Sequence, residues 1–306
     1  MLLAHGAPDR VEDIPEFLLN VRGGRKLPDA VVQEIIRRYS LIGGGSPLLT
    51  LTNRQAEGLA KSIAQPVYVG MRNWKPFIAD TILRLSDDGV DRVVALCLAP
   101  HNSRTSIGLY KQQLAEAIEK VAPNLHVDFV ESWHDHPLLI AAFREKVASA
   151  LAQVEAEAGG PVLVIFTAHS VPEKTIADGD PYEQQVRETA ALVANAMGLM
   201  ECRVAFQSQG MTAEPWIGPT VESQIDRLAE AGRRYVLLAP VGFVSDHVET
   251  LYDIDVVFRD YGKAKGVIVR RSESLNDSPL FVQALASIVT ARIKASARPA
   301  HSGETR

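Results

Sequence analysis

Residues 162–169 read VLVIFTAH, and a mostly polar segment then leads to YEQQVRETAALVANA at residues 182–196. The first stretch is a continuous apolar run that ends at a histidine, which is typical of a strand buried on both faces. The second stretch repeats apolar residues at helical spacing. A buried strand followed by an amphipathic helix is the repeating unit of a layered α/β fold.

The same unit recurs along the whole chain. Because helices of about 10 residues or more separate the apolar runs, the strands are expected to pair in parallel through right-handed crossovers. The predicted strands are Leu2–His5, Val67–Gly70, Val93–Pro100, Val127–Glu131, Val162–His169, Arg203–Gln207, Tyr235–Pro240 and Val267–Arg271. The predicted helices are Pro28–Tyr39, Leu51–Ile63, Lys75–Leu85, Gly108–Val121, Pro137–Ala158, Tyr182–Ala196, Thr220–Ala231 and Pro279–Ala295.

The pattern runs twice, with four strands before Pro137 and four after it. It predicts two similar doubly wound parallel-sheet domains of the Rossmann-like type, an N-terminal one over residues 1–137 and a C-terminal one over residues 138–278. The helix at about 279–295 is expected to pack back on the first domain. Ligands in such folds bind at the carboxyl ends of the strands, so those positions hold the candidate functional residues.

Composition excludes several classes of protein. The net charge of −5 argues against a globally basic nucleic-acid binder, and 46% hydrophobic residues argue against disorder. No stretch approaches the roughly 20 apolar residues that span a bilayer, and no signal peptide is evident, so we expect a cytoplasmic protein with no transmembrane segment. Cys97 and Cys202, both in apolar stretches, are expected to be core or near-core thiols rather than a disulfide or a metal pair. The first strand starts almost at Met1, so we expect the native start to lie upstream, and the polar end at residues 296–306 to fray.

Ionisable residues follow two of the predicted strands. His169 ends a very apolar strand, where partial desolvation favours the neutral imidazole that can act as a base or a metal ligand. After the strand Tyr235–Pro240, a helix starting at Asp246 would place Asp246, Glu249 and Asp253 on one stripe. Three carboxylates so placed repel one another unless a cation or proton intervenes. The alternatives are a hydrogen-bonded structural histidine and a solvated helix start.

Other candidates are weaker. Ser170 lacks the G-x-S-x-G context of a hydrolase nucleophile, and the His134/His136 pair has no third ligand nearby in sequence, which favours surface histidines. Trp216 could stack on a flat ligand or fill a hinge. The segment 43–47 (GGGSP) lacks the Lys-Ser/Thr pair of a phosphate loop. We expect Ser46 to cap the following helix, or its backbone to line a ligand cleft.

Together these motifs resemble the ferrochelatase family. Nearly the whole chain takes part in the resemblance, and the motifs occur in the family's order. They are 168–174 (AHSVPEK), 179–182 (GDPY), 207–210 (QSQG), 215–219 (PWIGP), 240–255 (PVGFVSDHVETLYDID), 45–48 (GSPL), 70–72 (GMR), 75–77 (KPF) and 98–101 (LAPH).

The resemblance implies a lyase of haem biosynthesis that inserts Fe²⁺ into a porphyrin held in a cleft between two chelatase-like α/β domains. His169 and Glu249 would be the catalytic residues and would bind the metal or take the pyrrole protons, and the resemblance leaves open which does which. Asp253 would form an outer metal site. Val257 stands one turn further, where many members of the family continue the acidic series. The residues implied to bind the porphyrin are Arg22, Arg25, Ser46, Arg72, Tyr110 and Trp216, with Lys26 as a further cation for its propionates.

The implied substrates are ferrous iron and either coproporphyrin III or protoporphyrin IX. The segment 21–26 (VRGGRK) resembles enzymes acting on coproporphyrin III, which is therefore favoured. No permanently bound cofactor and no iron–sulfur cluster are expected, because the C-terminal cysteine cluster of animal members is missing. We expect a monomer that contacts other haem-pathway enzymes transiently. The alternatives are a cobalt chelatase of cobalamin synthesis, and a protein that binds a tetrapyrrole without chemistry.

Overall fold

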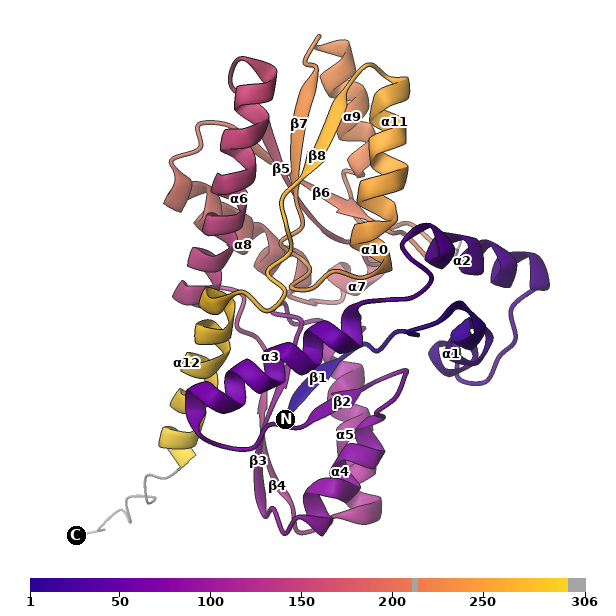
Figure 1. The fold of residues 1–306 in the computed structure, drawn as a ribbon, viewed down its shortest axis with the longest axis vertical. Coiled ribbons are helices and arrows are strands. Elements are labelled where there is room, and N and C mark those ends of the chain that lie inside the picture. Colours follow the sequence, from indigo (N-terminus) through magenta and orange to yellow (C-terminus); the bar gives the residue numbers. More distant parts are fainter. Residues whose placement is uncertain (211–213, 297–306) are drawn as a thin grey trace.

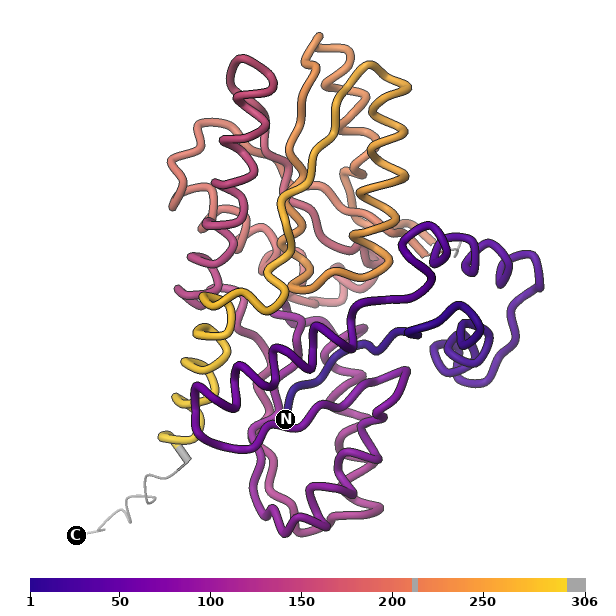
Figure 2. Tube along the Cα trace, viewed as in Figure 1, coloured from indigo at the N-terminus to yellow at the C-terminus, as the bar shows by residue number. Residues whose placement is uncertain are grey.

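A computed structural model describes residues 1–210 and 214–296 of the chain, and the fraying predicted for residues 296–306 lies almost wholly outside them. In the described part, eight strands form two four-stranded sheets with only parallel neighbours (Figures 1 and 2). The predicted α/β fold class is therefore confirmed. The first sheet contains β1 (Leu2–Ala4), β2 (Val69–Met71), β3 (Arg92–Cys97) and β4 (His126–Val130), and the second contains β5 (Leu163–His169), β6 (Cys202–Gln207), β7 (Tyr235–Ala239) and β8 (Ile268–Arg271).

The two sheets have the same topology, with the orders β2-β1-β3-β4 and β6-β5-β7-β8. In each, the chain first adds a strand on one side of the starting strand and then crosses to the other side. The strand order therefore reverses between β1 and β3, and again between β5 and β7. Crevices at the carboxyl ends of such strand pairs are where doubly wound folds bind ligands.

Helices cover both sheets. They are α1 (Ile14–Val21), α2 (Asp29–Leu41), α3 (Leu48–Ile63), α4 (Ile78–Asp87), α5 (Ile107–Val121), α6 (Pro137–Ala158), α7 (Glu173–Ala177), α8 (Tyr182–Met197), α9 (Val221–Glu230), α10 (Val248–Leu251), α11 (Arg259–Ala264) and α12 (Pro279–Ser296). A 3₁₀ turn precedes α1 at Val11–Asp13, and a π-helix joins α10 to α11 at Asp253–Phe258. No helix among the described residues is long and apolar enough to cross a membrane.

The last helix ties the two halves together. α12 packs on both α3 and α6 and also contacts β3 (Figure 1). Its buried Phe281 and Leu285 share one apolar core with Leu96 of the first sheet and Phe166 of the second. The domain boundary at residue 137 stays a prediction, because this core continues across it.

The structure corrects several predicted boundaries. The first strand ends at Ala4, which leaves His5 in the loop after it, and the helix predicted from Leu51 starts at Leu48. The segment after β7 is not one helix from Asp246. It is instead the short α10, the π-helix and α11. The short π-helix is a rare element that is often found at functional sites.

Candidate active site

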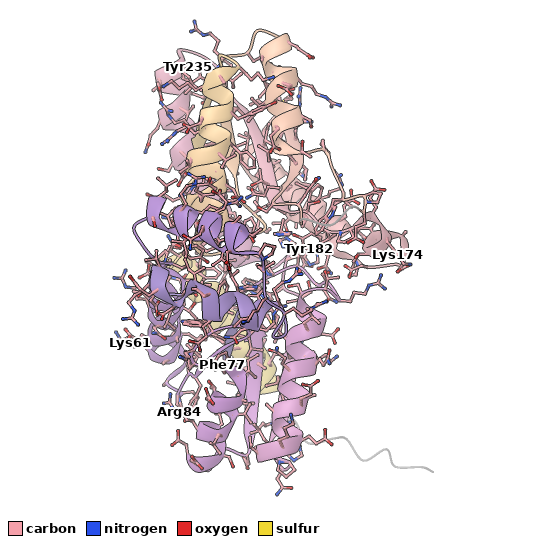
Figure 3. The ribbon with its side chains drawn as sticks, turned by 90° about the vertical axis from the view of Figure 1, so that its right-hand side faces the viewer. Lys61, Phe77, Arg84, Lys174, Tyr182 and Tyr235 are labelled. Carbon is pink, nitrogen blue, oxygen red and sulfur yellow. The ribbon has the colours of Figure 1, made fainter. Side chains whose placement is uncertain are left out.

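The carboxyl ends of the two sheets face each other where the halves of the molecule meet. In Figure 1 the segments that follow β1, β5 and β7, towards α1, α7 and α10, all lie at this level, and Figure 3 places Tyr182 there as well. The charge of Glu249 in the second half contributes to raising the pKa of both Tyr182 and Tyr39, although burial is the larger cause for each. Since Tyr39 belongs to the first half, Glu249 lies close enough to affect ionisable groups in both halves.

His169 is the last residue of β5, a strand that is buried along its length and paired on both sides. Its Nδ1 contacts the carbonyl oxygen of Ser170 at very short range. A carbonyl only accepts, so Nδ1 is the donor in this contact. The Tyr182 hydroxyl donates to the His169 carbonyl at 2.9 Å, and the ring of Trp216 lies 6.5 Å from the imidazole, centre to centre.

The Nε2 atom of His169 lies 3.7 Å from Glu249 Oε1, and both side chains are about one-third exposed, at 36% and 33%. The structure thus brings together the two residues that the sequence places 80 positions apart. Gly242 permits this approach, since a Cβ at that position would lie 2.5 Å from the Cβ of Ala168. The loop that carries Glu249 can therefore cross directly over the end of β5.

Glu249 sits in the first turn of α10, where several contacts fix its backbone. His247 is the N-cap, and its Nδ1 accepts a hydrogen bond from the Glu249 amide at 3.0 Å. The side-chain amide of Gln207 donates to the Glu249 carbonyl at 2.8 Å. Local capping and the end of β6 together aim the carboxylate at His169.

Asp246 does not join the predicted stripe of carboxylates. It lies before α10 and forms an ion pair of 3.0 Å with Arg271, and it also accepts hydrogen bonds from Ser274 and Asn276. Burial alone would raise the pKa of Asp246, but the Arg271 charge and these hydrogen bonds lower it overall. The prediction of a three-residue stripe is wrong for Asp246, because its ion pair with Arg271 holds it elsewhere.

Asp253 stays near Glu249 and is the most perturbed acid of the site. Burial, and secondarily the Glu249 charge, raise its pKa to about 6, although the Ser208 hydroxyl donates to it at 2.5 Å. Asp253 lines a pocket of about 570 Å³ together with Arg38, Ser208, Glu222 and Val257. This carboxyl therefore binds a proton more readily than an ordinary aspartate does, and it does so on the lining of this pocket.

In the first half of the chain, His5 directly follows β1. Its position corresponds to that of His169 at the end of β5. Its Nδ1 lies 2.9 Å from the Gly6 carbonyl, and its Nε2 accepts from the Asn73 side-chain amide at 3.0 Å. Desolvation by the surrounding protein atoms and the Arg72 charge lower the pKa of His5 to about 4, although its side chain keeps solvent exposure.

Reasoning from the sequence missed His5. The signal was an internal repeat: residues 4–8 read AHGAP and residues 168–172 read AHSVP. The two histidines take equivalent places at the central strands of their sheets, and in each the Nδ1 contacts the next residue's carbonyl oxygen. Ser170, by contrast, is fully buried and donates to the Ile217 carbonyl at 2.8 Å, which gives it a structural role.

The residues predicted to bind the porphyrin fall into two groups. Arg72 follows β2, and its guanidinium lies 5.2 Å from the centre of the buried Tyr110 ring. Trp216 lies beside His169, in the second half of the chain. These three residues therefore belong to the region of the two histidines.

The other three predicted residues lie further along the chain from the strand ends. Ser46 is buried, and its hydroxyl accepts from the Leu48 amide at 3.3 Å, while its own amide donates to the Pro8 carbonyl. Arg22 and Arg25 are exposed on the connection between α1 and α2, where Arg25 Nε donates to the Arg22 carbonyl. Apart from this bond between them, neither arginine forms a hydrogen bond or ion pair with another predicted site residue in the described part of the chain.

Comparison with known proteins gives one consistent answer. The sequence model of the family described as Ferrochelatase matches residues 1–293. A ferrochelatase of Acidobacterium capsulatum is 46% identical over 98% of this chain and 96% of its own length. A protein of Geobacillus sp. named coproporphyrin III ferrochelatase is 38% identical over 96% of this chain and 97% of its own length.

Solved structures support the fold alone. The sirohydrochlorin chelatase SirB from Bacillus subtilis, in complex with cobalt, superimposes with a TM-score of 0.60 over 96% of this chain and 94% of that one, at 11% identity. The arrangement of the two paired sheets therefore matches that of this solved structure. Because the family match spans nearly the whole sequence and the curated relatives agree with it, the chain belongs to the ferrochelatase family, whose enzymes are lyases that insert iron into a porphyrin.

Proposed function

We propose that this enzyme inserts Fe²⁺ into coproporphyrin III, and that His169 and Glu249 are the catalytic pair. The observation that carries the proposal is the 3.7 Å approach of His169 Nε2 to Glu249 Oε1 at the point where the second sheet reverses its strand order. An imidazole lone pair and a carboxylate suit a divalent iron ion. The same two groups can accept protons from pyrrole nitrogens.

The reaction must release two protons, because the free porphyrin carries two N–H groups and the metallated ring carries none. Nε2 of His169 and the carboxylate of Glu249 are the acceptors or the metal ligands at one face of the ring. Asp253 takes protons onward, since its pKa of about 6 lets it bind and release them and it lines the neighbouring pocket. The outer metal site predicted at Asp253 has no second carboxylate at Val257, so proton transfer is the role we assign.

His5 would face the other side of the macrocycle. Its low pKa of about 4 keeps the ring neutral at physiological pH. Arg72 beside it supplies the positive charge that a porphyrin carboxylate needs. The exposed Arg22 and Arg25, with Lys26, would meet the remaining propionates at the rim of the cleft.

Two lines of support favour coproporphyrin III over protoporphyrin IX. Several relatives at 34–38% identity are named coproporphyrin III ferrochelatases. Coproporphyrin III also carries four propionates rather than two, which matches a cleft edged by several cations. The oligomeric state, the compartment, the partner enzymes and the absence of a permanent cofactor stay predictions.

The test is an anaerobic assay with Fe²⁺ and each porphyrin in turn, followed by the absorption spectra of the products. We expect the specificity constant kcat/KM to be at least about tenfold higher for coproporphyrin III, which corresponds to about 1.4 kcal/mol. Equal rates, or faster insertion into protoporphyrin IX, would overturn the choice of substrate. Loss of iron insertion in His169→Ala, with porphyrin binding retained, is expected for the catalytic pair.

A further inference from the structure

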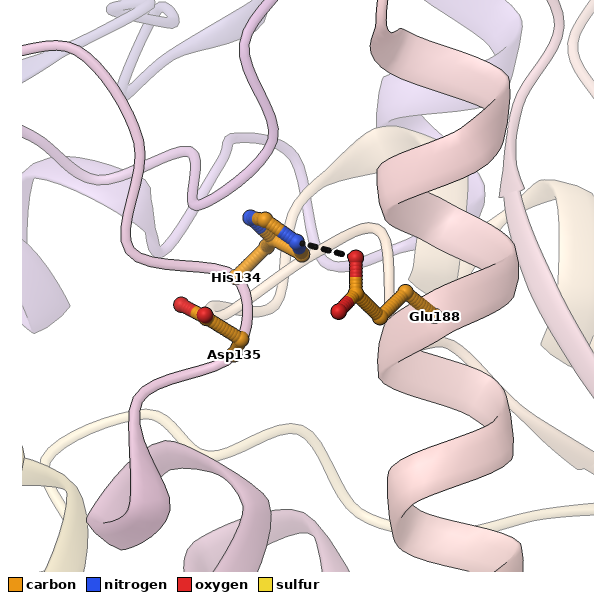
Figure 4. A group of neighbouring side chains, drawn as sticks. All are labelled: His134, Asp135 and Glu188. Atoms are coloured by element: carbon orange, nitrogen blue, oxygen red, sulfur yellow. Dashed lines mark hydrogen bonds and ion pairs between the residues drawn. The ribbon is translucent and has the colours of Figure 1, made fainter.

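A second group of metal-ligating side chains lies outside the active site. The connection between β4 and α6 carries His134 and Asp135, and it packs against α8, which carries Glu188 (Figure 4). One nitrogen or oxygen from each residue lies within 4.8 Å of the other two. His134 Nε2 and Glu188 Oε2 are only 3.0 Å apart. None of the three takes part in the proposed chelation chemistry.

The imidazole is held as ligating histidines usually are. Its second nitrogen, Nδ1, lies 2.8 Å from the Ser132 hydroxyl, which is itself 3.1 Å from the Pro100 carbonyl. A metal-bound histidine commonly has its other ring nitrogen fixed in this way, which sets the plane of the ring. Nε2 is then directed at Glu188. The Thr189 hydroxyl also donates to the His134 carbonyl at 2.8 Å, so the backbone of the connection is already anchored on α8.

The two carboxylates lack a permanent positive partner. Among the residues that the structure describes, no lysine or arginine forms an ion pair with Asp135 or Glu188. By contrast Glu183, on the same helix, is paired with Arg187 at 2.7 Å. Glu188 is 46% exposed and Asp135 is also exposed, so an ion can enter from solvent.

We propose that His134, Asp135 and Glu188 bind a divalent cation of the zinc class and that the ion clips the β4–α6 connection to α8. Zinc bonds of about 2.0–2.1 Å at tetrahedral angles put neighbouring ligand atoms roughly 3.3 Å apart, close to the 3.0 Å between Nε2 and Oε2. A rotamer change of the exposed Asp135 brings in the third ligand, and water completes the shell. The clip joins segments from the two halves of the chain, on either side of α6.

The experiment measures zinc binding without porphyrin in full-length protein that carries His169→Ala, which disables the proposed active-site ligand pair. Calorimetric titration with Zn²⁺ and thermal unfolding are compared for this parent and for versions that add Glu188→Gln or His134→Gln. Glu183→Gln in the same parent is the matched control on α8. Circular dichroism without metal verifies that every variant folds.

We expect the parent and the Glu183→Gln version to bind one zinc ion more than the Glu188→Gln and His134→Gln versions. At a hundredfold excess of free zinc over the dissociation constant, this ion should raise Tm by about 4 °C, and both additional substitutions should remove that rise. Equal stoichiometry and an equal rise in Tm in all four proteins would overturn the proposal. So would binding that depends on Glu183 rather than on Glu188.

Discussion

Replacing Asp253 by Asn tests the electrostatics of the active site through stability. The pKa of this carboxyl is raised to about 6 from the ordinary 3.8, so its ionised form is disfavoured in the folded protein. Above pH 6 the group is ionised in both the folded and the unfolded chain, and it then costs stability. The cost is absent at pH values well below the pKa that Asp253 has in the unfolded chain, because the carboxyl is then protonated in both states. It grows as the pH rises towards the pKa that Asp253 has in the folded protein.

The magnitude follows from the shift. About two pKa units correspond to roughly 3 kcal/mol, at 1.36 kcal/mol per unit. An unfolding entropy of about 2.1 cal/mol/K per residue converts this into a change in Tm of about 5 °C for a chain of this length. Asparagine keeps an oxygen that can accept from Ser208 but carries no charge. About 0.6 kcal/mol of this cost is already present at pH 4, so the Tm of Asp253→Asn minus that of wild type should be about 4 °C larger at pH 7.5 than at pH 4.

Differential scanning fluorimetry at the two pH values measures this difference. Asp260→Asn is the control, because that carboxylate lies on the neighbouring α11 with a side chain that is 63% exposed. It should change the pH dependence of Tm by no more than about 1 °C. If the Tm of Asp253→Asn minus that of wild type is equal at the two pH values, or larger at pH 4, the pKa of Asp253 is not raised in the folded protein.

Three further results are expected. Gly242→Ala should lower the free energy of unfolding by about 1–3 kcal/mol and slow iron insertion, because the added methyl meets Ala168 at 2.5 Å; unchanged unfolding in urea would contradict the close approach. Arg271→Met should lower the free energy of unfolding, measured by chemical denaturation, by about 3–5 kcal/mol, because Asp246 and Asp255 lose their positive partner. A loss below about 1 kcal/mol would show that neither carboxylate needs Arg271. His5→Ala should slow iron insertion at least about tenfold while porphyrin binding, followed by fluorescence quenching, is retained; a normal rate would remove His5 from the mechanism.

Most of the fold could be predicted from local patterns. The continuous apolar run at 163–168 marks a strand buried on both faces, and the alternation of such runs with amphipathic helices requires parallel pairing. The predicted strands all overlap observed ones. Strand ends were less predictable, because an end such as Ala4 depends on where the neighbouring strand stops pairing rather than on the residue itself.

Site residues on segments that follow strand ends could be predicted from the sequence. Residues whose position or pKa depends on tertiary contacts could not. His169 ends β5 and Glu249 lies on the segment after the adjacent β7, so parallel pairing brings both segments to one edge of the sheet, while contacts such as that of Gln207 fix the final approach. The departure of Asp246 depends on Arg271, which arrives from β8 and has no signature in the local sequence. The enclosure that raises the pKa of Asp253 likewise arises from packing between segments distant in the sequence.

If His169 and Glu249 act together on the ring, Glu249→Gln should disable iron insertion. The measurement is the single-turnover rate of Fe²⁺ insertion into coproporphyrin III, under anaerobic conditions and with porphyrin binding checked separately. Amide for carboxylate keeps the shape but removes the proton acceptor, so the rate should fall by about 10²–10⁴-fold, whereas Glu183→Gln should leave it unchanged. A Glu249→Gln rate within about twofold of wild type would contradict the account.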